Sequence, residues 1–387
     1  MNGVEAFRNL QAEATAWRHY LHENPELDYR LYNTARFLAE KLGSFGVDHI
    51  ETGIAETGIV ALMSGRCGAG PTIALRADMD ALPILEQSEK LWSSKVSGKM
   101  HACGHDGHMA MLLGAAKYLA ATRRFRGGVA LIFQPAEEDG VGGKRMVQAG
   151  IMDRFSITKV FGLHNVPGIE VGKFGICHGP IMAALDEFDL IVKGRGGHAA
   201  KPHEAIDPVV IAAQIIVGLQ TLVSRYTNPI EALVISVTKL SAARAYNVIP
   251  DQVEMAGSVR TLVPDLREFA ERQILSSARG IARGFGADVE FRYCRSGPVT
   301  INHVEETNLA IKAARNLVGP TSVDDKILPR MGSEDFAYML EARPGAIIFL
   351  GNGSTVGLHH PAYDFNDDTL PYGIGYWVNL VETVLAP

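Results

Sequence analysis

The sequence predicts an α/β protein with a mostly parallel central sheet, interrupted by an inserted α+β domain. Apolar strand-like segments alternate with helical segments in the first half of the chain and again near its end, a pattern typical of α/β proteins. Between them, residues 185–297 follow the order β-α-β-β-α-β of a ferredoxin-like sandwich. The 387 residues, 47% of them hydrophobic, are enough for two domains.

The α/β part is predicted from both ends of the chain. Apolar residues recur at helical spacing over 106–122, and GVALIFQP at 128–135 is nearly all apolar, as in a sheet covered on both faces. Further strands are predicted at 58–65, 71–80, 158–165 and 346–353, and a further helix at 306–319. Residues 1–184 and 298–387 are therefore predicted to form one domain.

The inserted part is predicted from a change of rhythm near residue 185. Strands are expected at 186–194, 231–240, 251–262 and 287–298, and helices at 207–225 and 265–286. The first of these helices is the most apolar segment of the chain, but Gln214 interrupts a short apolar run. We therefore interpret it as a core helix rather than a membrane span.

Composition excludes some classes of function. The net charge of −6 and the lack of a lysine- or arginine-rich run argue against binding to nucleic acid or to an acidic membrane surface. The first residues carry acids and have no apolar core of the signal-peptide kind. The four cysteines lie far apart without disulfide spacing, which predicts a cytoplasmic protein.

The segment MHACGHDGHMAM, residues 100–111, concentrates polar groups that can do chemistry. In extended backbone, Cys103 and His105 would project to the same side. A thiolate beside an imidazole suits zinc, manganese, cobalt or nickel. A thiol nucleophile with a histidine base, or a buried turn with locally satisfied polar groups, fits the segment as well.

Further candidate groups follow other apolar strands. Glu137 and Glu138 come after strand 128–135, where one acid can bind a cation while its neighbour acts as a general base. Alone, such a pair is usually solvated surface. His164 and the pair His359–His360 follow two more apolar strands, so the groups are expected at one edge of the sheet. Together they form a ligand set for two metal ions.

Nine sequence blocks between residues 21 and 368 carry a family resemblance: LHENPEL, LRADMDALPI, GKMHACGHDGH, FQPAEED, GLHNVP, GRGGHAAKPHEAIDP, YNVIPD with GSVRTL, MGSEDF and LHHPAYDFND. The chain resembles the amidohydrolase branch of the aminoacylase/carboxypeptidase-like metallopeptidases, with hippurate hydrolase and indoleacetyl-amino-acid hydrolase. The resemblance implies a zinc-peptidase-like catalytic domain at 1–184 and 298–387, and a satellite dimerisation domain at 185–297.

The resemblance also implies the groups of a binuclear centre with two divalent ions per subunit (zinc, manganese, cobalt or nickel). The implied ligands are Cys103, His105, Glu138, His164 and His359. Glu137 is implied as the general base, and Asp80 as a group that orients a ligand histidine. Asp78 stands where related peptidases outside this branch carry a histidine ligand, and the cysteine ligand compensates.

In the inserted domain, the resemblance implies that His198 reaches the active site of a partner subunit and polarises the scissile carbonyl. It thus implies a homodimer, or a tetramer, formed through this domain. Asn247 and Arg260 are implied to hold the substrate carboxylate, for which arginine offers a bidentate fork. Without the resemblance, His198 could equally be a surface histidine in a turn.

The function implied is metal-dependent hydrolysis of N-acyl amino acids, hippurate-like or N-acetyl, to a carboxylate and a free amino acid. A metal-activated water attacks the amide and a glutamate acts as general base. Three alternatives stay open. A dipeptidase or aminopeptidase of the same clan would need a site for a free α-amino group, and a cysteine hydrolase would use Cys103. A metal-binding module would have no turnover.

Overall fold

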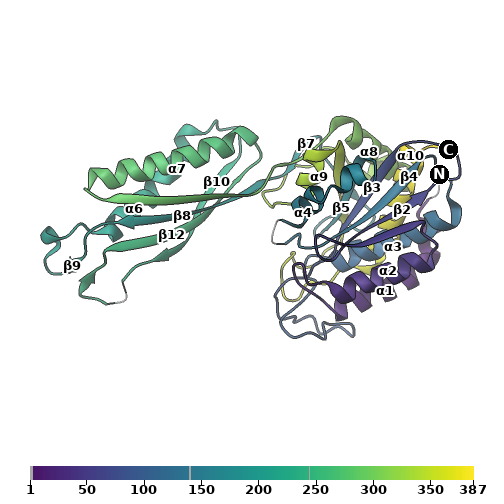
Figure 1. The fold of residues 1–387 in the computed structure, drawn as a ribbon, viewed down its shortest axis with the longest axis horizontal. Coiled ribbons are helices and arrows are strands. Elements are labelled where there is room, and N and C mark those ends of the chain that lie inside the picture. Colours follow the sequence, from purple (N-terminus) through teal and green to yellow (C-terminus); the bar gives the residue numbers. More distant parts are fainter. Residues whose placement is uncertain (1–2, 139–140, 244) are drawn as a thin grey trace. The chain divides into compact units, whose positions relative to one another are not determined.

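The computed structural model describes residues 3–138, 141–243 and 245–387. Contacts between Cα atoms divide the chain into two compact units (Figure 1). Unit 1 comprises Met1–Gly179, Ile301–Leu328 and Asp335–Pro387, and unit 2 comprises Pro180–Thr300 and Pro329–Glu334. The chain therefore enters unit 2 twice, the second time for only a short segment.

Unit 1 is built on an eight-stranded sheet. The strands in spatial order are β1 (His49–Ile54), β2 (Gly58–Ser64), β4 (Gly128–Gln134), β3 (Thr72–Asp78), β5 (Ile157–Val166), β16 (Gly345–Gly351), β6 (Phe174–Gly175) and β15 (Val323–Asp324). The central strands β4, β3, β5 and β16 are parallel. β1 and β2 pair antiparallel with their neighbours, and β6 pairs antiparallel with β16 but parallel with β15. The predicted α/β class with a mostly parallel sheet is confirmed, and the carboxyl ends of four strands share one edge.

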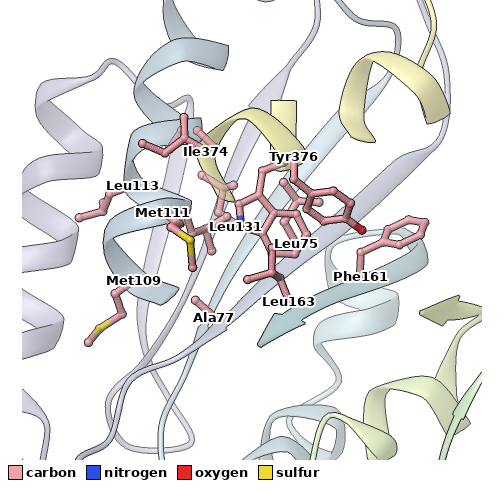
Figure 2. Packing of buried hydrophobic residues seen from close by; sticks show 14 of the residues in the cluster. Leu75, Ala77, Met109, Met111, Leu113, Leu131, Phe161, Leu163, Ile374 and Tyr376 are labelled. Atoms are coloured by element: carbon pink, nitrogen blue, oxygen red, sulfur yellow. The ribbon is translucent and has the colours of Figure 1, made fainter. Parts of the chain in front are cut away.

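Helices cover both faces of this sheet (Figure 1). One face carries α1 (Gln11–Glu23), α2 (Tyr32–Ser44), α3 (His105–Thr122), α8 (Val304–Val318) and α10 (Leu370–Val384). The other carries the shorter α4 (Gly142–Gln148), α5 (Ile151–Arg154) and α9 (Ala337–Ala342). In Figure 2, Leu75 of β3 and Leu131 of β4 pack with Met111 of α3 and Ile374 of α10. Burial on both faces explains the nearly all-apolar strands.

Unit 2 contains the predicted order β-α-β-β-α-β. Its elements are β8 (Ala184–Lys193), α6 (Pro208–Thr221), β10 (Leu233–Ser241), β12 (Gln252–Thr261), α7 (Pro264–Gly284) and β13 (Asp288–Gly297). The strands pair antiparallel in the order β10-β12-β8-β13, and both helices pack on one face. A separate two-stranded ribbon joins β9 (Gly197–His198) to β11 (Val248–Ile249).

Several short elements complete the chain. They are η1 (Val4–Leu10), β7 (Gly179–Met182), η2 (Pro202–Glu204), the π-helical turn η3 (Leu222–Tyr226), β14 (Thr300–Asn302), η4 (Pro320–Ser322) and η5 (Asp367–Thr369).

Helix α6 is only half buried. Ile211 and Ile215 face the sheet of unit 2, whereas Val210 and Val217 are 52% and 66% exposed. Of the helices in the described residues, this one alone, continued to Tyr226, has the length and apolar composition that a membrane crossing would need. The interpretation as a core helix is wrong for its outer face, because that face is apolar and uncovered in the single chain.

Candidate metal centre

The predicted site residues of unit 1 follow the carboxyl ends of neighbouring parallel strands. Asp80 comes two residues after β3, and Glu137 and Glu138 follow β4. His164 lies near the end of β5, and His359 follows β16. Cys103 and His105 stand at the start of α3. This edge of a parallel sheet is where α/β proteins place their ligands.

The structure brings the five sequence-predicted ligands together. Cys103 Sγ lies 3.5 Å from His164 Nε2. Glu138 lies between two histidines, with Oε1 3.9 Å from His105 Nε2 and Oε2 3.4 Å from His359 Nε2. Cys103, Glu138 and His359 also present ligand atoms within 4.8 Å of one another.

Cys103 and His105 do not lie in extended backbone, so that expectation is wrong. Gly104 between them has a φ of +92° and forms the N-cap of α3. The turn is tight, because a Cβ added at Gly104 would lie 2.1 Å from Asn165 Nδ2. A left-handed glycine therefore places the cysteine and the histidine beside each other.

Two non-glycine residues at the site also have left-handed backbone. His359 has a φ of +63° and donates its N–H to the carbonyl of Ala102 at 2.8 Å. Ala136, directly before Glu137, has a φ of +53°. Such conformations cost on the order of 1–3 kcal/mol each and cluster at functional sites. His360 is exposed, and its Nδ1 accepts the N–H of Ala362 instead of facing Glu138.

Asp80 acts on both sides of the cluster. Its carboxylate accepts the backbone N–H groups of Glu137 at 3.0 Å and Glu138 at 3.1 Å. Its backbone carbonyl lies 2.8 Å from His105 Nδ1, which leaves His105 Nε2 directed toward Glu138. Asp80 thus holds the acidic turn with its side chain and orients the histidine with its backbone.

Glu137 lies beside the cluster with a half-buried carboxylate. One of its oxygens lies within 4.8 Å of the ligand atoms of His105 and Glu138. A carboxylate at this distance can exchange a proton with a water molecule held at the cluster.

The electrostatics of the cluster fit a cation. Burial opposes a charge on His105, yet the attraction of Asp78 and the contacts with Asp80 and Glu138 raise the pKa of His105 to about 10. His105 Nε2 and Glu138 Oε1 are buried, and neither has a hydrogen-bond partner among the described residues. Buried polar atoms without partners, in a field of negative charge, are expected where a metal binds.

The same electrostatics argue against a cysteine nucleophile. Burial, together with the charges of Glu138 and Glu137, raises the pKa of the Cys103 thiol well above its usual range. Reactive cysteines have a lowered pKa, and although Cys103 precedes the start of α3, burial and the neighbouring carboxylates outweigh the effect of the helix N-terminus. A divalent cation at the cluster would reverse this effect, because it holds a bound cysteine as thiolate.

His108 and Asp78 join the cluster although the resemblance gave neither of them a role at the centre. Ligand atoms of Asp78, His105, His108 and His164 lie within 4.8 Å of one another. His108 is not suited to bind a metal, because its Nδ1 lies 2.6 Å from Asp78 Oδ1 and its Nε2 accepts the N–H of Asn165 at 3.0 Å. Both residues stand in blocks quoted above, but neither block indicates this pairing.

The predicted residues of unit 2 separate into two places. His198 in β9 pairs with Val248 in β11, and the carbonyl of Asn247 accepts the N–H of Ala199 at 3.0 Å, so His198 and Asn247 are neighbours. The Gly196 N–H bonds Asp251 just before β12, which places the ribbon at the Gln252 end of the sheet.

Arg260 lies near the other end of β12, and its Nη1 donates to Ser333 Oγ at 3.1 Å. Eight residues of strand between Gln252 and Arg260 span about 27 Å. Arg260 is therefore far from the pair His198 and Asn247 within unit 2.

The protein has the features of a two-domain metallopeptidase. It combines a mostly parallel sheet, a cluster of metal-ligating side chains at one sheet edge, and an inserted β-α-β-β-α-β unit. Residues 74–383 match the model of Peptidase family M20/M25/M40, and the chain belongs to this family. The resemblance inferred from the sequence is thereby confirmed.

Similar proteins carry more specific names. An N-acetylcysteine deacetylase of Bacillus subtilis (strain 168) is 40% identical over 95% of this chain and 96% of its own. A hippurate hydrolase of Campylobacter jejuni is 39% identical over 98% of both chains. The crystal structure of the Bacillus subtilis YXEP protein, described as a dinuclear metal binding peptidase of the M20 family, has a TM-score of 0.86. It is 36% identical and covers 98% of this chain and 99% of its own.

Proposed function

We propose that the protein is a metal-dependent amidohydrolase that splits N-acyl amino acids into a carboxylate and a free amino acid. The convergence of Cys103, His105, Glu138, His164 and His359 at one sheet edge carries this proposal. The names of relatives at about 40% identity support the reaction class.

The five converging side chains would hold two divalent ions. When bound, the ions supply Lewis acidity, which lowers the pKa of a water molecule and polarises the amide carbonyl. The donor set of one thiolate, three imidazoles and one carboxylate suits zinc, manganese, cobalt or nickel.

Glu137 moves the proton in this scheme. Its carboxylate takes a proton from the water as the water oxygen bonds to the amide carbon. When the C–N bond breaks, Glu137 gives that proton to the leaving nitrogen, so the products are an amine and a carboxylic acid, which ionises to the carboxylate. The hydrogen bond from the Glu137 N–H to Asp80 and the left-handed backbone of Ala136 hold the base in place.

The substrate class follows from what the named relatives share. N-acetylcysteine and hippurate, which is N-benzoylglycine, differ in acyl group and side chain, yet both have a free carboxylate beside the amide nitrogen. Arg260 is the group that we assign to this carboxylate, since a guanidinium can bind it through two parallel hydrogen bonds. Its half-buried position, with Ser333 as a partner, supports the assignment.

His198 and Asn247 would serve a second copy of the chain. His198 and Asn247 lie at the Gln252 end of β12, and Arg260 lies about 27 Å further along the strand. One small N-acyl amino acid does not bridge this distance. Helix α6 contacts the edge strand β10 as well as β12, and Val210 and Val217 on its outer face are exposed. An apolar helix face next to an open sheet edge supports a homodimer through unit 2.

We also place the protein in the cytoplasm. Cys67 and Cys294 are free thiols, and both are exposed. Free exposed thiols are typical of a reducing compartment.

Chelation followed by alkylation tests the proposed function. Removal of the metal should abolish hydrolysis of hippurate and of N-acetyl amino acids, and divalent ions should restore it. Cys103 should react slowly with iodoacetamide in the loaded enzyme and faster after chelation, since the cation holds and covers the thiolate. Turnover that survives complete chelation would instead favour the cysteine hydrolase.

A further inference from the structure

Asn165 is a fully buried residue that contacts both segments carrying the cluster's cysteine and histidine ligands. It follows His164 at the end of β5 and has no exposed surface. No role was predicted for Asn165 from the sequence. Its backbone and its side chain are both used in hydrogen bonds, and each set fixes a different ligand.

The backbone of Asn165 fixes His164. Its carbonyl lies 2.7 Å from His164 Nδ1, which must carry the proton because a carbonyl only accepts. His164 Nε2 therefore keeps its lone pair, and this atom lies 3.5 Å from Cys103 Sγ. The Asn165 N–H donates to His108 Nε2 at 3.0 Å, so the His108 proton sits on Nδ1, which donates to Asp78.

The side chain of Asn165 fixes Cys103. Its Nδ2 donates to the carbonyl of Cys103 at 2.9 Å. The hydroxyl of Tyr363 lies 2.8 Å from Asn165 Oδ1 and 3.1 Å from Nδ2, which holds the amide plane. Gly104 leaves room for this amide, because any Cβ there would collide with it.

Asp78, at the far end of this hydrogen-bonded chain, is anchored in the core. Its second oxygen accepts from Arg76 Nη1 at 2.7 Å. Arg76 in turn donates to Gln134 at 2.9 Å and to Asp335 at 3.1 Å, and all four side chains are buried. The backbone of Asn165 is thus tied through His108 to a charge network that cannot shift without leaving buried charges unpaired.

We propose that Asn165 is a positioning residue that sets the placement of Cys103 and His164 as a pair of metal ligands. The inference rests on the proposed metal centre and adds a determinant of its affinity. A purely structural role for Asn165 would lower the stability of the fold without changing how tightly the folded protein binds a metal.

The test uses three variants of the full chain. Asn165→Ala removes the side-chain bonds, and Tyr363→Phe removes only the hydroxyl that holds the amide. Tyr376→Phe is the matched control, since Tyr376 is also fully buried and its hydroxyl has no hydrogen-bond partner among the described residues. Cobalt is the probe, because a thiolate bound to Co²⁺ gives a charge-transfer band in the near ultraviolet.

We expect the Co²⁺ dissociation constant, measured by competition with a chelator, to rise by about 10- to 100-fold in Asn165→Ala. It should rise by about 3- to 10-fold in Tyr363→Phe, with an altered thiolate band, and stay unchanged in Tyr376→Phe. The melting temperature of each metal-free variant reports the folded state separately, so a loss of affinity in a variant that melts like the wild type supports positioning.

Unchanged cobalt affinity in folded Asn165→Ala and Tyr363→Phe would overturn the proposal, as would an equal loss in Tyr376→Phe. If the wild type itself binds cobalt without a thiolate band, the metal centre fails, and this inference fails with it. The two failures are therefore distinguishable.

Discussion

The metal-binding edge of unit 1 and the His198 ribbon of unit 2 carry sequence motifs of equal clarity but are built very differently. At the edge, hydrogen bonds with Asp80 and Asn165 fix the backbone or ring of five proposed site residues. His198 is exposed, and its ring accepts one N–H from Ala200, within its own turn, at 3.1 Å. The first region is preorganised by its own chain, whereas the His198 ring has one hydrogen bond, to a residue of its own turn.

The two regions also differ in their buried ion pairs. Arg18 of α1 has no exposed surface and lies 3.8 Å from Asp106, 3.2 Å from Asp364 and 2.8 Å from Asp367. It thereby joins the start of α3 to the segment after His359. Because removal of one partner would leave uncompensated buried charge, this network resists rearrangement. The described residues of the ribbon contain no buried ion pair of this kind.

The largest expected effect is a loss of turnover without a loss of metal, in a variant of Glu137. Glu137→Gln should lower turnover by about 10²- to 10⁴-fold while leaving the metal content unchanged, since only the proton carrier is lost. Glu138→Gln is the matched control, with the same change one residue later. It should lose metal, because Glu138 faces both His105 and His359.

Metal analysis and steady-state kinetics on the purified variants check both outcomes. Loss of metal in Glu137→Gln along with activity would move Glu137 into the ligand set.

The next prediction tests whether His198 acts in the active site of a second copy of the chain. His198→Ala should lower turnover by about 10²- to 10³-fold, as for the loss of one oxyanion donor. A one-to-one mixture of His198→Ala and Glu137→Ala chains should recover about a quarter of wild-type activity, because random pairing makes half the dimers mixed and each of these has one complete site of two.

Mixed dimers of Glu137→Ala with Glu138→Ala are the control and should stay inactive, since both residues act within one chain. If verified mixed dimers with His198→Ala also stay inactive, the ribbon acts within its own chain and the proposed exchange is wrong.

The sequence could predict the edge because its residues share a physical position. Glu137, His164 and His359 each follow an apolar strand, and parallel strands end at the same edge of a sheet. The alternation of strands and helices likewise predicted the class of the fold. Both arguments depend only on local pattern and on the rule that parallel strands share a direction.

The supports of the site could not be predicted in this way. Asn165 and Tyr363 are 198 positions apart, and Arg76 and Asp335 are 259 apart, so no local pattern links them. The left-handed backbone of His359 was also hidden, because such a conformation is unusual for any residue except glycine. These contacts are imposed by tertiary packing.

The smallest expected effect concerns the stability of unit 1. Burial opposes a charge on His22 of α1, yet the hydrogen bond to Asp106 at 2.8 Å and its charge raise the pKa of His22 to about 9. A histidine in the unfolded chain has a pKa of about 6.5. Since the folded pKa is the higher one, the pair stabilises the fold fully below about pH 6.5, and this contribution is lost as the pH rises through about 9.

The difference in unfolding free energy between the wild type and His22→Gln should therefore shrink by about 3 kcal/mol between pH 6 and pH 10. Urea denaturation followed by a probe in unit 1 measures it. His203→Gln is the control, because His203 in unit 2 is 75% exposed and its nearest carboxylate, on Glu204, is 3.8 Å away. The difference in unfolding free energy between His203→Gln and the wild type should not change between pH 6 and pH 10. A flat profile for His22→Gln as well would mean that His22 is neutral in the folded protein, and the charge network behind α3 would then end at Arg18.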